Sequence, residues 1–313
     1  MAMLRTGLLY FDQAVRDGSI RKAAETLNIA SSAINRQLLQ LEDEMGVELF
    51  ERLPRGIRPT AAGELLLSYI RRWNREVAAM RQKVGELRGG VRGTIRIAAA
   101  ESITEDILPR ALSELHLRFP LVEYSLISGD NHRITTELFA KEADVVIAFD
   151  VANSIRADVV HTVRSPLGVI CPLDHPIARF KTVTVGECAQ YPLVIPGESW
   201  LKHSGLQHLL AEYTGMTQIV ARAERPGMLK ALVKAGLGIA FLTHLGVERD
   251  VEEGRLAWVP LARGIINPAT ISVMVPRGQI PPLSTMALLE LLKRHLSDFA
   301  AKQPGFAAQA PSN

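Results

Sequence analysis

The sequence has little cysteine: Cys171 and Cys188 are the only two in 313 residues. They form no C-x-x-C pair, and the eight histidines stand singly, so no metal site is predicted. Cys171 lies in an apolar run, and nothing nearby would lower a thiol pKa. We therefore expect two plain buried thiols in a reducing compartment, with a redox switch built from the pair as the alternative.

Long hydrophobic runs are also absent. No stretch of about 18 apolar residues occurs, and the amino terminus lacks the charged, apolar and small-residue order of a secretory signal. We therefore expect no membrane span and a cytoplasmic location. With 47% hydrophobic and 22% charged residues the chain is expected to fold, and its length favours two or three domains.

Motifs of the common enzyme sites are missing as well. There is no G-x-S-x-G, no P-loop, no H-E-x-x-H and no G-x-G-x-x-G after a strand. The sequence therefore predicts neither a catalytic residue nor a cofactor.

The net charge is only +3, so its distribution along the chain is more informative than its size. Residues 1–92 hold 15 Lys or Arg against 11 Asp or Glu, whereas the remainder holds 21 against 22. The excess of positive charge therefore lies in the amino-terminal part, as expected if that part binds nucleic acid.

The segment 19–42 predicts two short helices joined by a tight turn. Ser19 can cap the first helix, whose small apolar residues share one face. The second helix starts near Ser31 or Ser32, and its apolar residues recur at spacings of four, three and four. We expect this stripe to face inward: Ile34, Leu38, Leu41 and Met45.

The opposite face of the second helix is polar, and we expect it to be free of bulky apolar neighbours. Two such helices describe a helix-turn-helix, whose second helix can enter the major groove and contact base edges. An ordinary pair of core helices with a solvated polar face is the alternative. The residues predicted to contact DNA from this helix are Ser31, Ser32, Asn35, Arg36 and Gln40.

The next stretch predicts a β-hairpin wing. Gly46 can end the recognition helix in a left-handed cap, and Leu49 and Phe50 then form a core strand. Residues 51–58 follow with proline and glycine at turn positions. Phosphate or minor-groove contact is expected from the wing, and a solvated loop is the alternative. The arginines predicted to make this contact are Arg52, Arg55 and Arg58.

A long helix is predicted from Thr60, which can cap it, to about Arg88. Its apolar residues repeat at alternating spacings of four and three, which indicates a coiled coil. A dimer formed in this way would present two recognition helices to two half-sites. Packing of the seam on the chain's own core is the alternative. The predicted dimerisation residues are Leu66, Ile70, Trp73, Val77, Met80 and Val84.

Four motifs run through this region. They are F-x-x-x-V-x-x-G-S-I-x-x-A-A-x-x-L-x-I at 11–29, S-A-I-x-R-Q-L-x-x-L-E at 32–42, G-x-x-L-F-x-R at 46–52 and P-T-x-x-G at 59–63. Together they closely resemble the amino-terminal domain of LysR-type transcriptional regulators. The resemblance implies a DNA-binding regulator and not an enzyme. Its expected partners are double-stranded promoter DNA, further copies of the chain in a homodimer or homotetramer, and RNA polymerase.

This chain departs from the family pattern at the start of the recognition helix. Ala30 and Ser31 stand where the family usually has Ser or Thr followed by Gln, and Asn35 stands where it usually has Ser. We therefore expect a different operator preference. Our hypothesis is that Asn35 pairs bidentately with adenine, and that Arg36 contacts guanine or phosphate.

Predicted strands and helices alternate from residue 93 onward, which indicates an α/β sheet with crossover helices. Phrases at 112–120, 143–148 and 233–240 resemble the two-lobed, periplasmic-binding-protein-like (type 2) effector domain of the same regulators. The predicted fold class is therefore α/β multidomain. The predicted divisions are a winged helix-turn-helix domain at 1–60, a linker or dimerisation helix at 61–92, an effector-binding domain at 93–299 (lobe I at 93–162 and 265–299, lobe II at 163–264) and a tail at 300–313.

The effector, a small molecule that the sequence does not identify, is expected between the lobes. Ligands of such domains lie beyond the carboxyl ends of strands and at helix amino termini. Ser102 is the first choice because family members commonly place a Ser or Thr there, and simple helix capping is the alternative. The full predicted set is Ser102, Thr104, Phe149, Pro196, Gly197, Glu198 and Thr243.

Two competing functions stay open at this point. One is a small-molecule-binding protein or α/β enzyme that carries the helical domain for another purpose. The other is a transcription factor without an effector.

Overall fold

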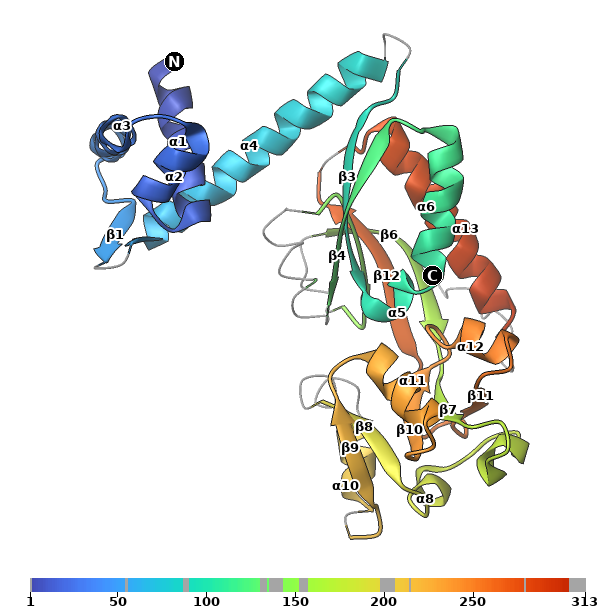
Figure 1. Ribbon diagram of the computed structural model, residues 1–313. Helices are drawn as coiled ribbons and strands as arrows, with labels where there is room; N and C mark the ends of the chain where they lie inside the picture. Colours follow the sequence, from blue (N-terminus) through green and yellow to red (C-terminus); the bar gives the residue numbers. More distant parts are fainter. Residues whose placement is uncertain are drawn as a thin grey trace. The chain divides into compact units, whose positions relative to one another are not determined.

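The computed structural model describes residues 2–53, 56–86, 90–129, 134, 143–151, 157–197, 206–213, 215–278 and 280–303. The chain divides into two compact units, Met1–Arg81 and Gln82–Asn313, and each is described by itself (Figure 1). The division falls inside the long helix, because the first part of that helix packs on the amino-terminal core.

The first unit is a helical core with a two-stranded wing, as the sequence predicts. Its elements are α1 (Ala2–Asp17), α2 (Ile20–Leu27), α3 (Ser31–Met45), β1 (Phe50–Leu53), β2 (Gly56–Pro59) and the start of α4 (Ala61–Glu86). Phe11 of α1 is fully buried, and its ring lies 4.7 Å from that of Phe50. Ile34, Leu38 and Leu41 of α3 pack in the same core.

The ends of α2 and α3 are set by residues in the left-handed conformation. Asn28 has φ 53° and Gly46 has φ 68°, and the backbone N–H of each donates to carbonyls of the preceding helix. Met45 is 43% exposed, so its predicted inward position is wrong. The last turn of α3 is exposed from Asp43 onward, because the helix extends beyond the core on which its earlier turns pack.

The wing is an antiparallel hairpin in which Phe50 pairs with Pro59. The backbone N–H groups of Leu49 and Phe50 donate to the Glu42 carboxylate of α3 at 2.7 and 3.2 Å, which fixes the hairpin to the recognition helix. Thr60 caps α4 as predicted, since its Oγ1 accepts from the Gly63 N–H at 3.1 Å. A Cβ at Gly63 would lie 2.2 Å from the Leu49 carbonyl oxygen, so only glycine fits this approach.

The second unit has two α/β lobes, each with a five-stranded sheet (Figure 1). The sheet of lobe I has the order β4-β3-β5-β12-β6, with β12 antiparallel to both of its neighbours. Helices α6 and α13 pack against each other beside this sheet (Figure 1). The elements of lobe I are β3 (Gly93–Ala100), α5 (Glu101–Thr104), α6 (Ile107–Arg118), β4 (Val122–Gly129), β5 (Val145–Phe149), β6 (Ala157–Ser165), β12 (Ala269–Pro276) and α13 (Leu283–Ala301).

The sheet of lobe II has the order β11-β7-β10-β8-β9, with β8 parallel to β9 and β10. Its strands are short and apolar, and β7, β8 and β10 are buried along their whole length, as expected for strands covered on both faces. The elements of lobe II are β7 (Leu167–Cys171), η1 (Pro176–Arg179), α8 (Val185–Cys188), β8 (Leu193–Pro196), α10 (Leu206–Ala211), β9 (Ile219–Ala223), α11 (Pro226–Lys234), β10 (Ile239–Thr243), α12 (Glu248–Glu252) and β11 (Ala257–Pro260).

Two predicted boundaries differ from the structure. Ser165 pairs with Ala269, so β6 belongs to lobe I to its end, and the predicted lobe boundary after residue 162 falls three residues too early. The tail does not begin at residue 300, because α13 continues to Ala301. Gln303 is also buried, and its Nε2 donates to the Arg164 carbonyl at 3.1 Å. The sequence predicted neither β11 nor the short elements η1, α8 and α12.

Other predictions lie outside the described residues. These are most of the helix expected at about 132–141, the start of the helix expected at 203–213, and the tail from 304 on. Among the helices that are described, none is both long enough and apolar enough to cross a bilayer.

Both cysteines are buried and free, as predicted. Burial raises the pKa of Cys171 to about 11, with a contribution from the charge of Asp174. Burial likewise raises the pKa of Cys188 to about 12. Because the thiolate is the reactive form, both thiols are inert near neutral pH.

Candidate nucleic-acid interface and ligand pocket

The recognition helix α3 has a buried stripe and an opposite face that is open. Ser31, Ser32 and Arg36 are exposed, and Asn35 is half-buried. Gln40 lies toward the edge of this face, where it accepts from Gln37 and donates to Glu44, both at 3.5 Å along the helix. Because the apolar stripe of α3 is buried, the predicted polar residues on the opposite face point outward.

One large apolar side chain also lies on this open face. Leu39 is 48% exposed and follows Asn35 by four residues, so the expectation of a face without bulky apolar groups is wrong. The sequence does carry a signal: Leu38 lies four residues after Ile34 of the buried stripe, whereas Leu39 lies four residues after Asn35 of the open face. Leu38 is the buried one.

The wing arginines have different partners. The Arg52 Nη2 donates to the Asn35 Oδ1 at 3.1 Å, which links the wing to the recognition helix. Arg58 is held within the hairpin, where its Nη2 and Nε donate to Glu51 Oε2 at 2.6 and 3.2 Å. Arg55, the third arginine predicted to contact DNA, lies outside the described residues.

The apolar seam of α4 divides into two parts. Ile70 is buried in the unit's own core and Leu66 is half-buried against it, as the alternative interpretation of the seam expected. The later residues are exposed within the single chain, so this part is available to a partner. They are Trp73 (59%), Val77 (38%), Met80 (56%) and Val84 (46%).

The second unit has a charged pocket of about 420 Å³, bounded by residues of both lobes. Ser102, the first predicted effector contact, lines it from α5 and is only 9% exposed. The N-cap residues of α5 and α6 are Ala100 and Asp106, so Ser102 does not cap either helix. Within the described part of the chain its hydroxyl has no hydrogen-bond partner, which leaves it available to a ligand.

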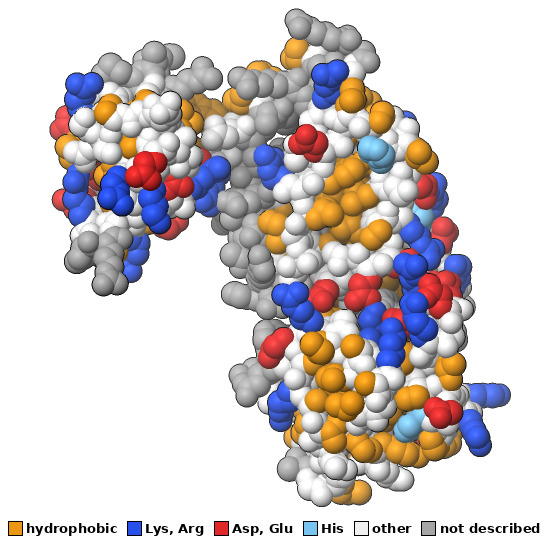
Figure 2. All heavy atoms as spheres, in the orientation of Figure 1, with side chains coloured by type: hydrophobic (Ala, Val, Ile, Leu, Met, Phe, Trp, Pro, Cys, Tyr) orange, Lys and Arg blue, Asp and Glu red, His pale blue; other side chains and the backbone are white. Residues whose placement is uncertain are grey.

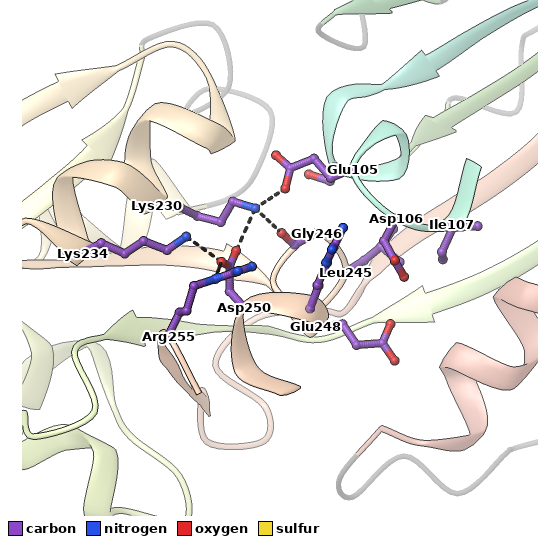
Figure 3. A pocket seen from close by; sticks show the side chains of 12 residues that line it. Glu105, Asp106, Ile107, Lys230, Lys234, Leu245, Gly246, Glu248, Asp250 and Arg255 are labelled. Carbon is purple, nitrogen blue, oxygen red and sulfur yellow. Dashed lines mark hydrogen bonds and ion pairs between the residues drawn. The ribbon is translucent and has the colours of Figure 1, made fainter. Parts of the chain in front are cut away.

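Lys230 of α11 links the two lobes across this pocket (Figure 3). Its Nζ forms an ion pair with Glu105 of lobe I and donates to the Gly246 carbonyl at 2.8 Å. Gly246 itself approaches lobe I closely, since a Cβ there would lie 2.7 Å from the Ser102 Cβ. Figure 2 shows acidic and basic side chains gathered in a band between the lobes.

Asp250 of α12 is the centre of this network and its side chain is 5% exposed. It accepts from Lys234 at 2.5 Å, from the Arg255 Nε at 2.9 Å and from Lys230 at 3.0 Å. Burial acts to raise the pKa of Asp250, but hydrogen bonds from these three cations outweigh burial and lower its pKa to about 2. Asp250 is therefore ionised at neutral pH.

The other predicted effector residues that the structure describes do not line this pocket. The hydroxyls of Thr104 and Thr243 donate to the carbonyls of Glu101 (2.7 Å) and Leu245 (3.1 Å). Phe149 is half-buried against the lobe I core. Pro196 and Gly197 lie at the end of β8, and Glu198 lies outside the described residues.

Sequence reasoning missed the charged residues of the pocket. Glu105 and Lys230 are 125 positions apart, and no motif connects them. The one local signal is that Lys230 and Lys234 share a face of α11, which on its own describes an ordinary solvated helix. Among the described residues, no three His, Cys, Asp or Glu side chains are grouped so as to hold a metal ion.

Comparison with known proteins gives matches over both units. Residues 6–64 match the family model for bacterial regulatory helix-turn-helix proteins, lysR family, and residues 88–297 match the LysR substrate binding domain. The regulator CysB of Burkholderia cenocepacia is 26% identical over 288 residues, which cover 91% of each chain. The regulator CbbR of Xanthobacter flavus is 29% identical over 306 residues, 93% of this chain and 88% of the other.

Solved structures show the same fold. A full-length OxyR variant from Pseudomonas aeruginosa aligns with a TM-score of 0.68 at 19% identity, over 94% of this chain and 95% of the other. Full-length CbnR complexed with its target DNA aligns with a TM-score of 0.63 at 20% identity, over 93% of this chain and 99% of the other.

Proposed function

Because this chain belongs to the LysR family of DNA-binding transcriptional regulators, which are not enzymes, we propose that the open face of α3 contacts base edges in the major groove. Members of this family bind promoter DNA as oligomers and respond to small-molecule effectors. The observation that carries the proposal is the position of Ser32, Asn35 and Arg36 opposite the buried stripe of α3.

The reading surface combines polar and apolar groups. Asn35 and Arg36 can bond base edges, and the exposed Leu39 can contact a thymine methyl group. Arg58 of the wing supplies charge for the phosphate backbone, and Arg52 lies beside Asn35 on the reading surface. The proposed DNA contacts are Ser31, Ser32, Asn35, Arg36, Leu39, Gln40, Arg52, Arg55 and Arg58.

We assign dimerisation to the second part of α4. Its exposed stripe is too apolar to remain in water along several turns, and the repeat matches a coiled-coil seam. Ile70 and Leu66 support the stripe from within the unit's own core. The functional divisions are then a DNA-binding domain at 1–60, a linker helix at 61–92 and an effector-binding domain from 93 on. A protein that binds promoter DNA in this way works in the cytoplasm, beside RNA polymerase.

The effector is proposed to bind in the pocket between the lobes. Its volume suits a metabolite, and Ser102 offers a buried hydroxyl that has no hydrogen-bond partner among the described residues. Lys230 already bridges the lobes, so a ligand that bonds Ser102 and alters the Lys230–Glu105 pair would change how the lobes are held together.

DNA binding is tested by anisotropy titration of the full chain with duplex DNA from upstream of its own gene. We expect saturable binding that weakens with salt, and an affinity loss of about tenfold in Arg36→Ala. Arg277→Ala removes an exposed arginine from the second unit and should leave the affinity unchanged. Equal binding to a scrambled duplex would contradict sequence-specific reading.

Effector binding is tested by following the thermal unfolding of the full chain with a panel of small metabolites. A ligand that binds only the folded chain raises the melting temperature. We expect this rise to be lost in Ser102→Ala and kept in Thr104→Val, whose hydroxyl is bonded to the Glu101 carbonyl. The same rise in both variants would place the ligand elsewhere.

A further inference from the structure

The contact between Arg52 and Asn35 joins the wing to the reading face of α3. We propose that these two side chains form one composite reader that prefers a guanine edge to an adenine edge. The inference rests on the proposed function, because α3 must lie in the major groove for Asn35 to meet a base. It replaces the hypothesis that Asn35 alone pairs with adenine.

The partner of Asn35 fixes the orientation of its amide. A guanidinium has only donors, so the atom of Asn35 that lies 3.1 Å from the Arg52 Nη2 must be the carbonyl oxygen. The reversed amide would place N–H groups against N–H groups. The Nδ2 donors of Asn35 are therefore turned away from Arg52.

This orientation changes what the pair offers to DNA. Adenine presents one donor, N6, and one acceptor, N7, so it needs an amide whose oxygen is free. Here a charged donor already occupies that oxygen, and the positive charge beside it disfavours a second N–H group. Guanine presents two acceptors, O6 and N7, which match the Nδ2 of Asn35 and the remaining N–H groups of Arg52.

Arg52 is available for this role, whereas Arg58 is not. In the described part of the chain no carboxylate pairs with Arg52, and its hydrogen-bond partner is Asn35. Arg58 is held by Glu51 through two hydrogen bonds within the hairpin. The two arginines belong to the same wing and differ in their contact with α3, so Arg58 is a matched control.

The experiment is selection of binding sites from a randomised duplex library by the full-length protein. We expect wild type to enrich guanine at one position of each half-site. Arg52→Ala should shift that position toward adenine, changing the guanine-to-adenine ratio by about tenfold, because the free amide can then pair bidentately with adenine. Asn35→Ala should remove the preference in both the wild-type and the Arg52→Ala backgrounds.

Arg58→Ala separates base reading from phosphate contact. It should weaken binding to all sequences and leave the guanine preference intact. If Arg52→Ala behaved in the same way, or if Asn35→Ala kept the preference, the composite reader would be wrong. Failure of wild type to select any site would instead overturn the proposed function. Circular dichroism of each variant checks that the helices are intact.

Discussion

Charged side chains gather in two regions that differ in burial. On the wing, Arg58 and Glu51 are 2.6 Å apart with side chains that are 67% and 48% exposed. Between the lobes, Lys230 and Asp250 are 3.0 Å apart with side chains that are 8% and 5% exposed. The same type of ion pair is therefore exposed to water on the wing and buried between the lobes.

Burial decides what each region can do. An exposed pair contributes little to stability, since water and salt compete with it, so Arg58 can exchange its partner for a phosphate. A buried pair has already lost its hydration, so removing one partner leaves a charge with nothing to solvate it. The wing is thus suited to binding DNA, whereas Asp250 holds Lys230 within lobe II for its pair with Glu105 of lobe I.

The largest effect is expected from Asp250→Ala. The substitution removes the carboxylate that Lys230, Lys234 and Arg255 share. Lys230 is buried, with its side chain only 8% exposed, so its charge cannot be hydrated in exchange. We expect the free energy of unfolding to fall by about 3–5 kcal/mol. Urea denaturation of the full chain, followed by circular dichroism, measures this change in the transition of the second unit.

Glu253→Ala is the matched control for this prediction. Glu253 lies three residues further along and is exposed to solvent, where it pairs with Arg249 at 2.7 Å and with Arg255. Its loss should leave the transition close to that of wild type. Equal destabilisation by the two substitutions would show that burial is not what separates the regions.

The two regions also differ in how far the sequence predicts them. In the first unit each helix follows from a local repeat of three and four residues, and Gly46 predicts the end of α3. The periodicity of apolar residues does not show whether a helix face packs inside its own unit or against another chain. It therefore grouped Ile70 with Trp73 in one seam, although Ile70 packs inside the unit and Trp73 is exposed.

In the second unit the alternation of strands and helices was predictable, but the pocket was not. Glu105 and Lys230 meet only because two lobes bring together residues 125 positions apart. The sequence pointed to Ser102 through its place after the first strand of the domain and through family resemblance. The lobe boundary was misplaced because β6 continues to Ser165 without a turn signal before Pro166.

A second prediction concerns acid. The pKa of Asp250 is about 2 in the folded chain, below its ordinary value of 3.8, so the ionised group stabilises the fold above pH 4. This contribution, about 2 kcal/mol, is lost as the pH falls through 4 toward 2, and roughly half of it is gone by pH 3.

The measurement compares wild type with Asp250→Asn by urea denaturation between pH 7 and pH 3. We expect a constant difference in stability from pH 7 to 5 and a shrinking difference below about pH 4. Among the described residues, the charged groups around Asp250 are Lys230, Lys234, Arg249, Arg255, Glu105 and Glu253. A difference that did not depend on pH would mean that the carboxylate is not held ionised by its cations.

The smallest effect on stability is expected from Glu51→Gln on the wing. The pair with Arg58 is exposed, so the free energy of unfolding should change by only about 0.5 kcal/mol. DNA binding should change more, because Arg58 is released to contact a phosphate. We expect tighter binding to all duplexes, with the salt dependence steeper by about one phosphate contact, measured by anisotropy at several salt concentrations.

Glu76→Gln removes an acidic partner in the same way, from Arg72 of α4 at 2.8 Å, and should leave the salt dependence unchanged. If both variants steepened it equally, net charge alone would explain the gain and the wing would have no special role. If Glu51→Gln changed stability as much as Asp250→Ala, the contrast between the exposed and buried pairs would be lost.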